Sequence, residues 1–158
     1  MIDLHRILVP TDFSQHSRKA VTYAKAFAEK FGAEIILLHV FQDLAVFQPE
    51  AVAVAPTVQP VEEFLTAARN SLARMIQEND LGKFKVQAEV REGAPADEIV
   101  RFAAEKNVDL IMVGTHGRGW LAHVLLGSVT DKVVRKAPCP VLVVRLAEHE
   151  FVKPGQEA

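Results

Sequence analysis

Five short apolar runs, separated by longer segments with helical periodicity, are the feature of this sequence that most restricts its fold. The runs are residues 5–10, 34–41, 84–90, 109–114 and 140–146. All but the third are almost continuously apolar, which is typical of strands covered on both faces. The third alternates apolar and polar residues, which indicates an edge position. This strand–helix alternation predicts an α/β domain with a parallel sheet, right-handed crossovers and helices on both faces.

The segments between the runs carry helix signals as well as apolar stripes. In the first, Ser14 is a candidate N-cap and Gly32 a stop, and in the third Pro95 opens the first turn. The last helix begins near Ser128, and we expect it to turn three valines toward the core: Val129, Val133 and Val134.

Length and composition indicate a single globular domain. The chain has 158 residues, of which 49% are hydrophobic and 24% charged. We expect a domain over residues 1–147 and a short polar tail over 148–158. The residues between the second run and the next helix, 42–60, are Ala-, Val- and Pro-rich. We interpret them as a surface excursion, with a lid or a partner contact as the alternative.

Charge and cysteine content narrow the cellular setting. A net charge of −2 provides no basic field, so we expect no nucleic-acid partner. The single cysteine, Cys139, excludes an internal disulfide framework and is typical of a reducing compartment. The apolar run near the start is too short for a signal peptide, and no stretch approaches the roughly 18 apolar residues of a membrane span. We therefore expect a cytoplasmic protein without a membrane partner.

Two polar loops follow predicted strands and are the candidate binding site. In parallel sheets of this type, ligands bind outside the carboxyl ends of the strands. PTDFS, residues 10–14, follows the first run, and GTHGRGWLAHVLLGSV, residues 114–129, begins at the end of the fourth. No G-x-G-x-x-G follows the first strand and no G-x-x-x-x-G-K-[ST] occurs in the sequence, so neither a dinucleotide site there nor a P-loop is expected.

The glycine-rich stretch has the chemistry of an anion site. Its glycines allow the backbone to approach a ligand closely, and Gly127 opens a helix whose first N–H groups and dipole attract anions. Ser128 can cap that helix and offer its hydroxyl to a phosphate, Thr130 adds a second hydroxyl, and two further donors are available: His116 and Arg118. A glycine-rich turn before an ordinary helix, capped by Ser128 and Asp131, is the alternative. From composition alone, both interpretations stay open.

The spacing of the glycines resembles a known signature. Gly114-x-x-Gly117, nine residues and then Gly127-Ser128 is similar to the G-x₂-G-x₉-G-[ST] pattern of ATP-binding universal stress proteins, the UspA-like family. Four more segments resemble that family in the same order: PTDFS, LLHV, EGAPADEIV and PCPVLVVR. The resemblance covers residues 5–145. It implies a Rossmann-like, open twisted five-stranded parallel sheet in the order 3-2-1-4-5, which brings the two candidate loops together.

The resemblance also implies roles for individual residues. Asp12 would contact the ribose or a phosphate-bound metal, Pro10 and Thr11 would line the base pocket, and Val40 would present its backbone to the adenine edge. The ribose and phosphates would be wrapped by Gly114, Thr115, His116, Gly117, Arg118 and Gly119, and the phosphates held at the helix end by Gly127, Ser128, Val129 and Thr130. The implied cofactor is ATP, with Mg²⁺ or Mn²⁺.

The resemblance and the residues together predict a regulatory, stress-response nucleotide-binding module rather than an efficient enzyme. Besides Asp12 the sequence offers no convincing base, no Cys/His pair with a supporting acid and no metal-ligand cluster, so at most slow ATP hydrolysis is expected. The alternatives are an ATP-using adenylating or phosphotransfer enzyme and a nucleotide-free interaction protein. The family commonly dimerises through its last strand, and the apolar edge Pro140–Leu146 predicts a homodimer here.

Other residues invite a functional interpretation that the sequence does not require. Asp12 has an alternative role as an acid near the cap of the first helix. His39 lies within a predicted strand, and we interpret it as a packed, hydrogen-bonded histidine rather than a catalytic base. We interpret Cys139, between two prolines, as structural. Trp120 is a bulky residue within the glycine-rich loop, and the sequence does not predict the path of the backbone there.

Overall fold

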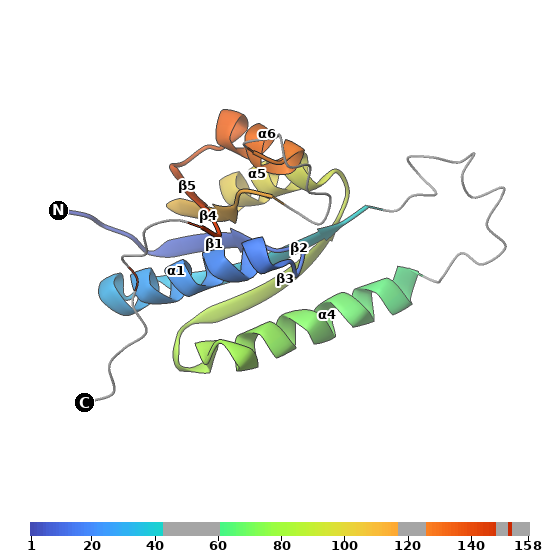
Figure 1. Ribbon diagram of the computed structural model, residues 1–158, viewed down its shortest axis with the longest axis horizontal. Helices are drawn as coiled ribbons and strands as arrows, with labels where there is room; N and C mark the ends of the chain where they lie inside the picture. The colour runs from blue at the N-terminus through green and yellow to red at the C-terminus, as the bar shows by residue number, and fades with distance from the viewer. Residues whose placement is uncertain (43–60, 117–125, 148–151, 153–158) are drawn as a thin grey trace, which may run out of the picture.

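A parallel five-stranded sheet in the order β3-β2-β1-β4-β5 forms the centre of the computed structural model (Figure 1). The structure describes residues 1–42, 61–116, 126–147 and 152. The strands are β1 (Arg6–Pro10), β2 (Glu34–Phe41), β3 (Val86–Glu92), β4 (Leu110–Gly114) and β5 (Val141–Val144). Each adjacent pair is parallel. The predicted α/β fold, its strand order and the edge position of β3 are confirmed.

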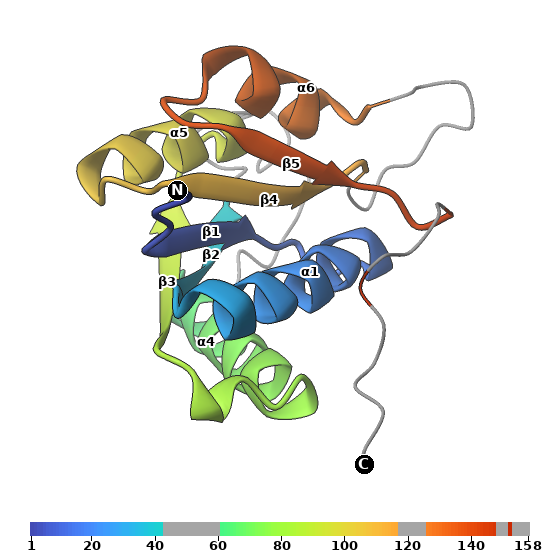
Figure 2. The same cartoon turned by 90° about the vertical axis from the view of Figure 1, so that its left-hand side faces the viewer.

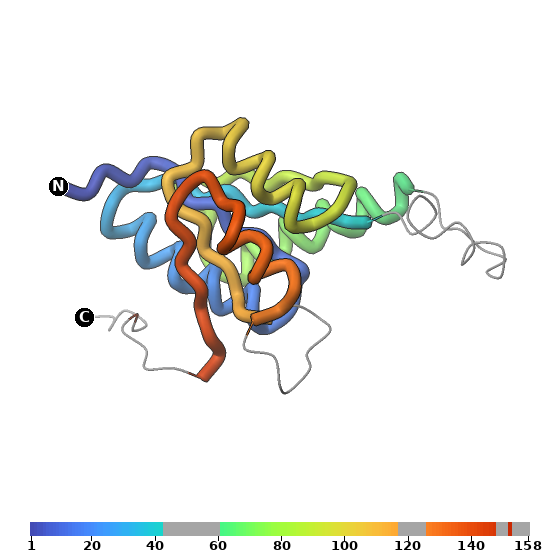
Figure 3. The backbone as a smooth tube through the Cα atoms, turned by 90° about the horizontal axis from the view of Figure 1, so that it is seen from above, coloured from blue at the N-terminus to red at the C-terminus, as the bar shows by residue number. Residues whose placement is uncertain are grey.

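Helices cover both faces of the sheet. They are α1 (Gln15–Phe31), α4 (Val61–Glu78), α5 (Pro95–Glu105) and α6 (Ser128–Lys136), with a short 3₁₀ turn η1 (Leu81–Lys83) before β3. Figure 2 shows α1 and α4 against one face and α5 and α6 against the other. Figure 3, from above, shows α5 and α6 side by side. No helix among the described residues is both long and apolar enough to cross a membrane.

The core consists of two apolar layers, one on each side of the sheet. Successive side chains of β1 alternate between them, because side chains of a strand point to opposite faces: Ile7 and Val9 pack under α1 and α4, whereas Leu8 packs under α5 and α6. All three are fully buried. The nearly continuous apolar runs of the sequence are therefore explained by burial on both faces.

The predicted helix ends are mostly confirmed. Ser14 caps α1 by accepting a hydrogen bond from the backbone N–H of Ser17, and Gly32 ends it in the left-handed conformation at φ 71°. Pro95 is the first residue of α5. These signals are reliable because each depends on residues within a single turn.

Two expectations drawn from the pattern were wrong. Val134 is 43% exposed, whereas its neighbour Val133 is fully buried, because adjacent helical residues lie about 100° apart and the nine-residue α6 has one narrow buried stripe. The third strand spans Val86–Glu92 rather than 84–90, and the fifth spans Val141–Val144 rather than 140–146. Residues 43–60, Trp120 and most of the predicted tail lie outside the described residues.

Candidate functional site

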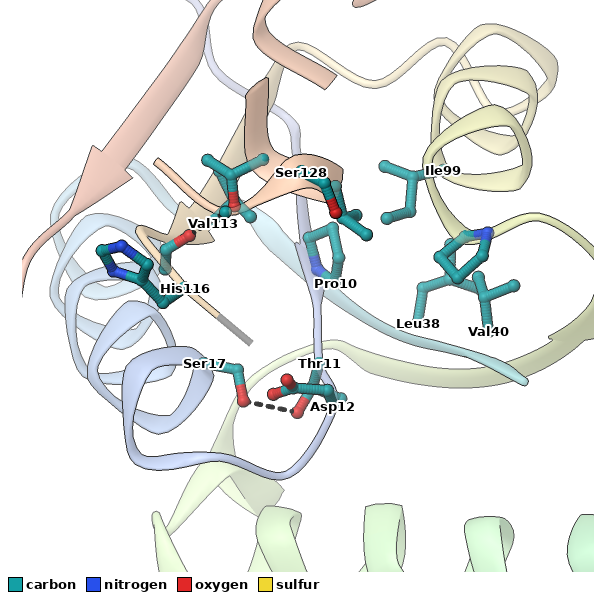
Figure 4. A pocket seen from close by; sticks show the side chains of 15 residues that line it. Pro10, Thr11, Asp12, Ser17, Leu38, Val40, Ile99, Val113, His116 and Ser128 are labelled. Atoms are coloured by element: carbon teal, nitrogen blue, oxygen red, sulfur yellow. Dashed lines mark hydrogen bonds between the residues drawn. The ribbon is translucent and has the colours of Figure 1, made fainter. Parts of the chain in front are cut away.

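A cavity of about 300 Å³ opens at the carboxyl ends of β1, β2 and β4 (Figure 4). Ten of the residues predicted from the sequence line it: Pro10, Thr11, Asp12, Val40, Gly114, His116, Gly127, Ser128, Val129 and Thr130. Thr115 is buried and is not among the lining residues. Gly117, Arg118 and Gly119 lie outside the described residues. The two candidate loops, about 100 residues apart in sequence, therefore meet at one cavity, as parallel strands require.

The turn between β1 and α1 is held by its own side chains. The backbone N–H of Phe13 donates to Thr11 Oγ1 at 3.0 Å, and that of Ser14 donates to Asp12 Oδ1 at 3.0 Å. The hydroxyl of Thr11 also lies 3.0 Å from Ser17 Oγ, the dashed bond in Figure 4. These local bonds fix the carboxylate of Asp12 at the cavity wall.

The N-terminus of α6 forms the opposite wall. Gly127, not Ser128, occupies the cap position, in an extended conformation and without a side-chain cap bond, so the predicted Ser128 cap is wrong. Ser128 is instead the first helical residue. Asp131, the other member of that predicted cap, accepts a hydrogen bond from Arg135 Nε at 3.0 Å. The first N–H groups of any helix lack intrahelical acceptors, so α6 presents an anion-attracting end to the cavity.

Two hydrogen bonds attach α6 to the end of β4. The hydroxyl of Thr130 donates to the carbonyl of Gly114 at 2.8 Å, and the N–H of Gly127 donates to the carbonyl of Thr115 at 2.7 Å. Because the single hydroxyl proton of Thr130 is engaged with Gly114, that hydroxyl does not donate to a ligand in this arrangement. Its side chain therefore positions the helix end.

Gly114 is required by packing within the protein. A Cβ atom at this position would lie 2.6 Å from the backbone C and O atoms of His16, in the first turn of α1. The sequence interpretation attributed this glycine to close approach of a ligand. In the structure, the close approach is that of α1 to the end of β4, two of the elements that border the cavity.

His16 is a residue near the site that the sequence analysis missed. Its ring lies 5.4 Å, centroid to centroid, from that of His116, and its Nδ1 lies 3.3 Å from Thr115 Oγ1. Burial and the neighbouring His116 lower the pKa of His16, and the Asp12 carboxylate partly opposes them. His16 is therefore mainly neutral at neutral pH.

Several lining residues that lie inside helices or strands were not predicted from the sequence: Ser17, Leu38, Pro95, Ile99 and Val113. The predicted residues lie mostly in loops that follow strands, whereas Ser17 belongs to α1 and two others belong to α5, Pro95 and Ile99. Pro95 marks the start of α5, and Ile99 lies one turn further along the same helix. The helical spacing of Pro95 and Ile99 places both residues on one face of α5, but it does not reveal that this face borders the cavity.

The remaining interpretations of single residues agree with the structure. His39 is half-buried and its Nδ1 lies 2.8 Å from the carbonyl of Thr11, so the hydrogen-bonded interpretation is confirmed. Burial, together with the charge of Asp109, raises the pKa of the Cys139 thiol, which favours a structural role. Within the described ranges, no group of three or more His, Cys, Asp or Glu side chains is placed to hold a metal ion.

Comparison with known proteins gives consistent matches. The model of the universal stress protein family matches residues 4–145. The chain is 39% identical over 153 residues to universal stress protein MJ0577 of Methanocaldococcus jannaschii, covering 89% of this chain and 94% of the relative. The solved structure of MJ0577 matches with a TM-score of 0.76 and 35% identity, covering 94% of this chain and 100% of the other.

Two further solved structures share the fold. Universal stress protein UspA from Lactobacillus plantarum matches with a TM-score of 0.72 and 29% identity, over 92% of this chain and 100% of the other. A universal stress protein in complex with cAMP matches with a TM-score of 0.64 over 92% of this chain and 100% of the other. At 24% identity, this last likeness concerns the fold alone.

Proposed function

Because the chain belongs to the universal stress protein family, we propose that its cavity binds ATP and that nucleotide occupancy sets the state of a regulatory, stress-response module. The observation that carries the proposal is the composition of one cavity, which is lined both by apolar side chains and by the N-terminus of a helix. A nucleotide needs both environments, one for the base and one for the phosphates. The relative in complex with cAMP supports the statement that this fold accommodates an adenosine phosphate.

The apolar wall suits a flat nucleobase. It is formed by side chains from β1, β2, β4 and α5: Pro10, Leu38, Val40, Val113, Pro95 and Ile99. Burial of an aromatic base against such side chains is favourable at about 25 cal/mol per Å² of apolar surface. The backbone of Val40 follows this wall and is the group we assign to the adenine edge.

The polar side of the cavity suits the ribose and phosphates. A carboxylate accepts hydrogen bonds from hydroxyls, and Asp12 is the lining carboxylate. The backbone N–H groups of Ser128 and Val129 lie in the first turn of α6, where the helix dipole favours an anion. Bound ATP would bring Mg²⁺ or Mn²⁺ on its phosphates, and the Asp12 carboxylate, which lines the cavity, is a candidate protein ligand for that ion.

The experiment that tests this proposal compares ATP binding in the parent protein and in a variant with two bulkier residues at the N-terminus of α6. Gly127 has φ −64° and ψ 156°, a backbone conformation that valine adopts, so the variant is the double substitution Gly127→Val, Ser128→Val. Its far-UV circular dichroism and urea midpoint are measured alongside to establish that it is folded. Lys132→Ala, exposed on the same helix, is the matched control. Nucleotide released by heat from the purified protein is identified by chromatography, and titration calorimetry measures the affinity for Mg·ATP, GTP and AMP.

We expect ATP binding in the parent and the Lys132→Ala control, and none in the double variant. At a ligand concentration about 100 times Kd, binding stabilises the native state by about 2.7 kcal/mol, which raises Tm by roughly 5–11 °C in a domain of this size. Absence of both co-purified nucleotide and a Tm shift with millimolar Mg·ATP would refute the proposal. Turnover at about 1 s⁻¹ or faster would identify an ATP-using enzyme instead.

We also propose that the protein is a cytoplasmic homodimer joined through the edge around β5. This strand pairs with β4 on one side only among the described residues. An apolar edge of this kind favours pairing with a second copy. Val143→Asp is expected to give monomers in light scattering after size exclusion, and an unchanged dimer would contradict this interface.

A further inference from the structure

The turn that carries Asp12 contains a backbone conformation that its sequence does not favour. Phe13, the residue after Asp12, has φ 65°. Among described non-glycine residues, positive φ also occurs at Asp80 and Asn107, which are residue types that tolerate it. A bulky aromatic residue in this region is uncommon and persists where its surroundings hold it in place.

Besides the hydrogen bonds within the turn, His39 contacts it from β2. Its ring lies 4.6 Å, centroid to centroid, from the ring of Phe13, with a tilt of 33°. Its Nδ1 lies 2.8 Å from the carbonyl oxygen of Thr11. Because a carbonyl oxygen only accepts hydrogen bonds, Nδ1 carries the proton and donates the hydrogen bond to the Thr11 carbonyl.

The neighbouring residue of β2 holds the same turn by its backbone. The N–H of Thr11 donates to the carbonyl of Leu38 at 2.8 Å. Both backbone groups of Thr11 are therefore bonded to consecutive residues of β2. The turn is attached to the sheet immediately before Asp12, and the packing of Phe13 on His39 secures it immediately after.

His39 lies outside the cavity wall itself. Side chains alternate along a strand, and Leu38 and Val40 line the cavity, whereas His39 is not among the lining residues. Phe13 packs against the core layer under α1 and α4. The histidine therefore acts on the site through the turn.

We infer that His39 is a positioning residue that holds the left-handed Phe13 turn and thereby keeps the Asp12 carboxylate at the nucleotide cavity. This inference rests on the proposed function and deepens it. It assigns a role to a side chain that contacts Thr11 and Phe13 rather than the ligand. The two contacts of His39 are chemically separable, which makes the role testable.

Three substitutions separate the hydrogen bond from the ring packing. His39→Asn keeps a donor attached to Cγ, as Nδ1 is, and removes the ring. His39→Phe keeps a ring against Phe13 and removes the donor. His39→Leu removes both, and His5→Gln, on the exposed N-terminal side of the sheet, is the control. The affinity for Mg·ATP is measured by titration calorimetry, and Tm is measured for each variant without ligand.

We expect ATP affinity to fall about tenfold in His39→Phe, as loss of one hydrogen bond predicts, and further in His39→Leu. His39→Asn should retain most of the affinity, and His5→Gln all of it. Nitrogen-15 NMR of the parent should show His39 protonated at Nδ1 with and without ATP. Equal affinity in the parent, His39→Phe and His39→Leu would overturn the inference.

A double-mutant cycle with Asp12→Ala distinguishes positioning from a general effect on stability. If His39 acts through the Asp12 turn, His39→Phe weakens ATP binding about tenfold in the parent but less than about threefold in the Asp12→Ala background. The same loss in both backgrounds would overturn the inference while leaving the proposed function intact. Failure of the parent to bind ATP would refute the proposed function, and this inference with it.

Discussion

Replacing Gly114 by alanine tests the packing on which the geometry of the site depends. The added Cβ would lie 2.6 Å from the backbone C and O atoms of His16 and 2.9 Å from its Cβ. Ordinary contact between carbon atoms is about 3.5–4.0 Å, so β4 and α1 must separate by roughly 1 Å. The obstructing atoms are mostly backbone, which a rotamer change does not remove.

The energetic cost follows from this geometry. Overpacking typically destabilises a protein by about 1–3 kcal/mol. We expect the upper end, about 3 kcal/mol, because the displacement also strains the bond from Thr130 to the Gly114 carbonyl. For a domain of this size each kcal/mol lowers Tm by roughly 2–4 °C, so Gly114→Ala should lower Tm by about 6–12 °C.

Two other glycines provide matched controls. An alanine at Gly82 meets nothing within 4 Å, and that position has no left-handed φ, so Gly82→Ala should stay within about 0.5 kcal/mol of the parent. Gly32 also faces open space but has φ 71°, so Gly32→Ala isolates the conformational cost, about 1 kcal/mol. Urea unfolding at pH 7.5 measures all three. If Gly114→Ala is as stable as Gly82→Ala, the reasoning about this contact is refuted.

Three further predictions concern α6 and the titration of His16. Thr130→Val removes the donor to the buried Gly114 carbonyl and should cost about 1–3 kcal/mol in urea unfolding, whereas Thr130→Ser should resemble the parent. Val133→Ala should cost roughly 2 kcal/mol and Val134→Ala less than about 0.5, and equal costs would contradict the assigned buried face. Burial and His116 lower the pKa of His16 below 6.5, so as pH falls through 6.5 the unfolded chain binds this proton first. The stability that His16 contributes above pH 6.5 is then lost. His16→Gln should therefore flatten the dependence of the urea midpoint on pH, and an unchanged slope would contradict this prediction.

Much of the architecture follows from signals that lie within single elements. Apolar runs identified the strands, and Ser14, Gly32 and Pro95 marked helix ends that the structure confirms. The strand order does not follow from such signals, because periodicity does not reveal which strands are neighbours. It was expected from the family resemblance, and the structure confirms it.

The sequence by itself determined that the chain forms a doubly covered parallel sheet with polar loops at its carboxyl edge. Tertiary structure decided which residues meet there. Ile99 reaches the cavity from within α5. Position 114 requires glycine because the backbone of His16 in α1 packs directly against it. It also placed His39 against Thr11, 28 residues away. Local signals depend on a few successive residues. These contacts depend instead on how each crossover helix packs on the sheet, and no short segment of the sequence contains that information.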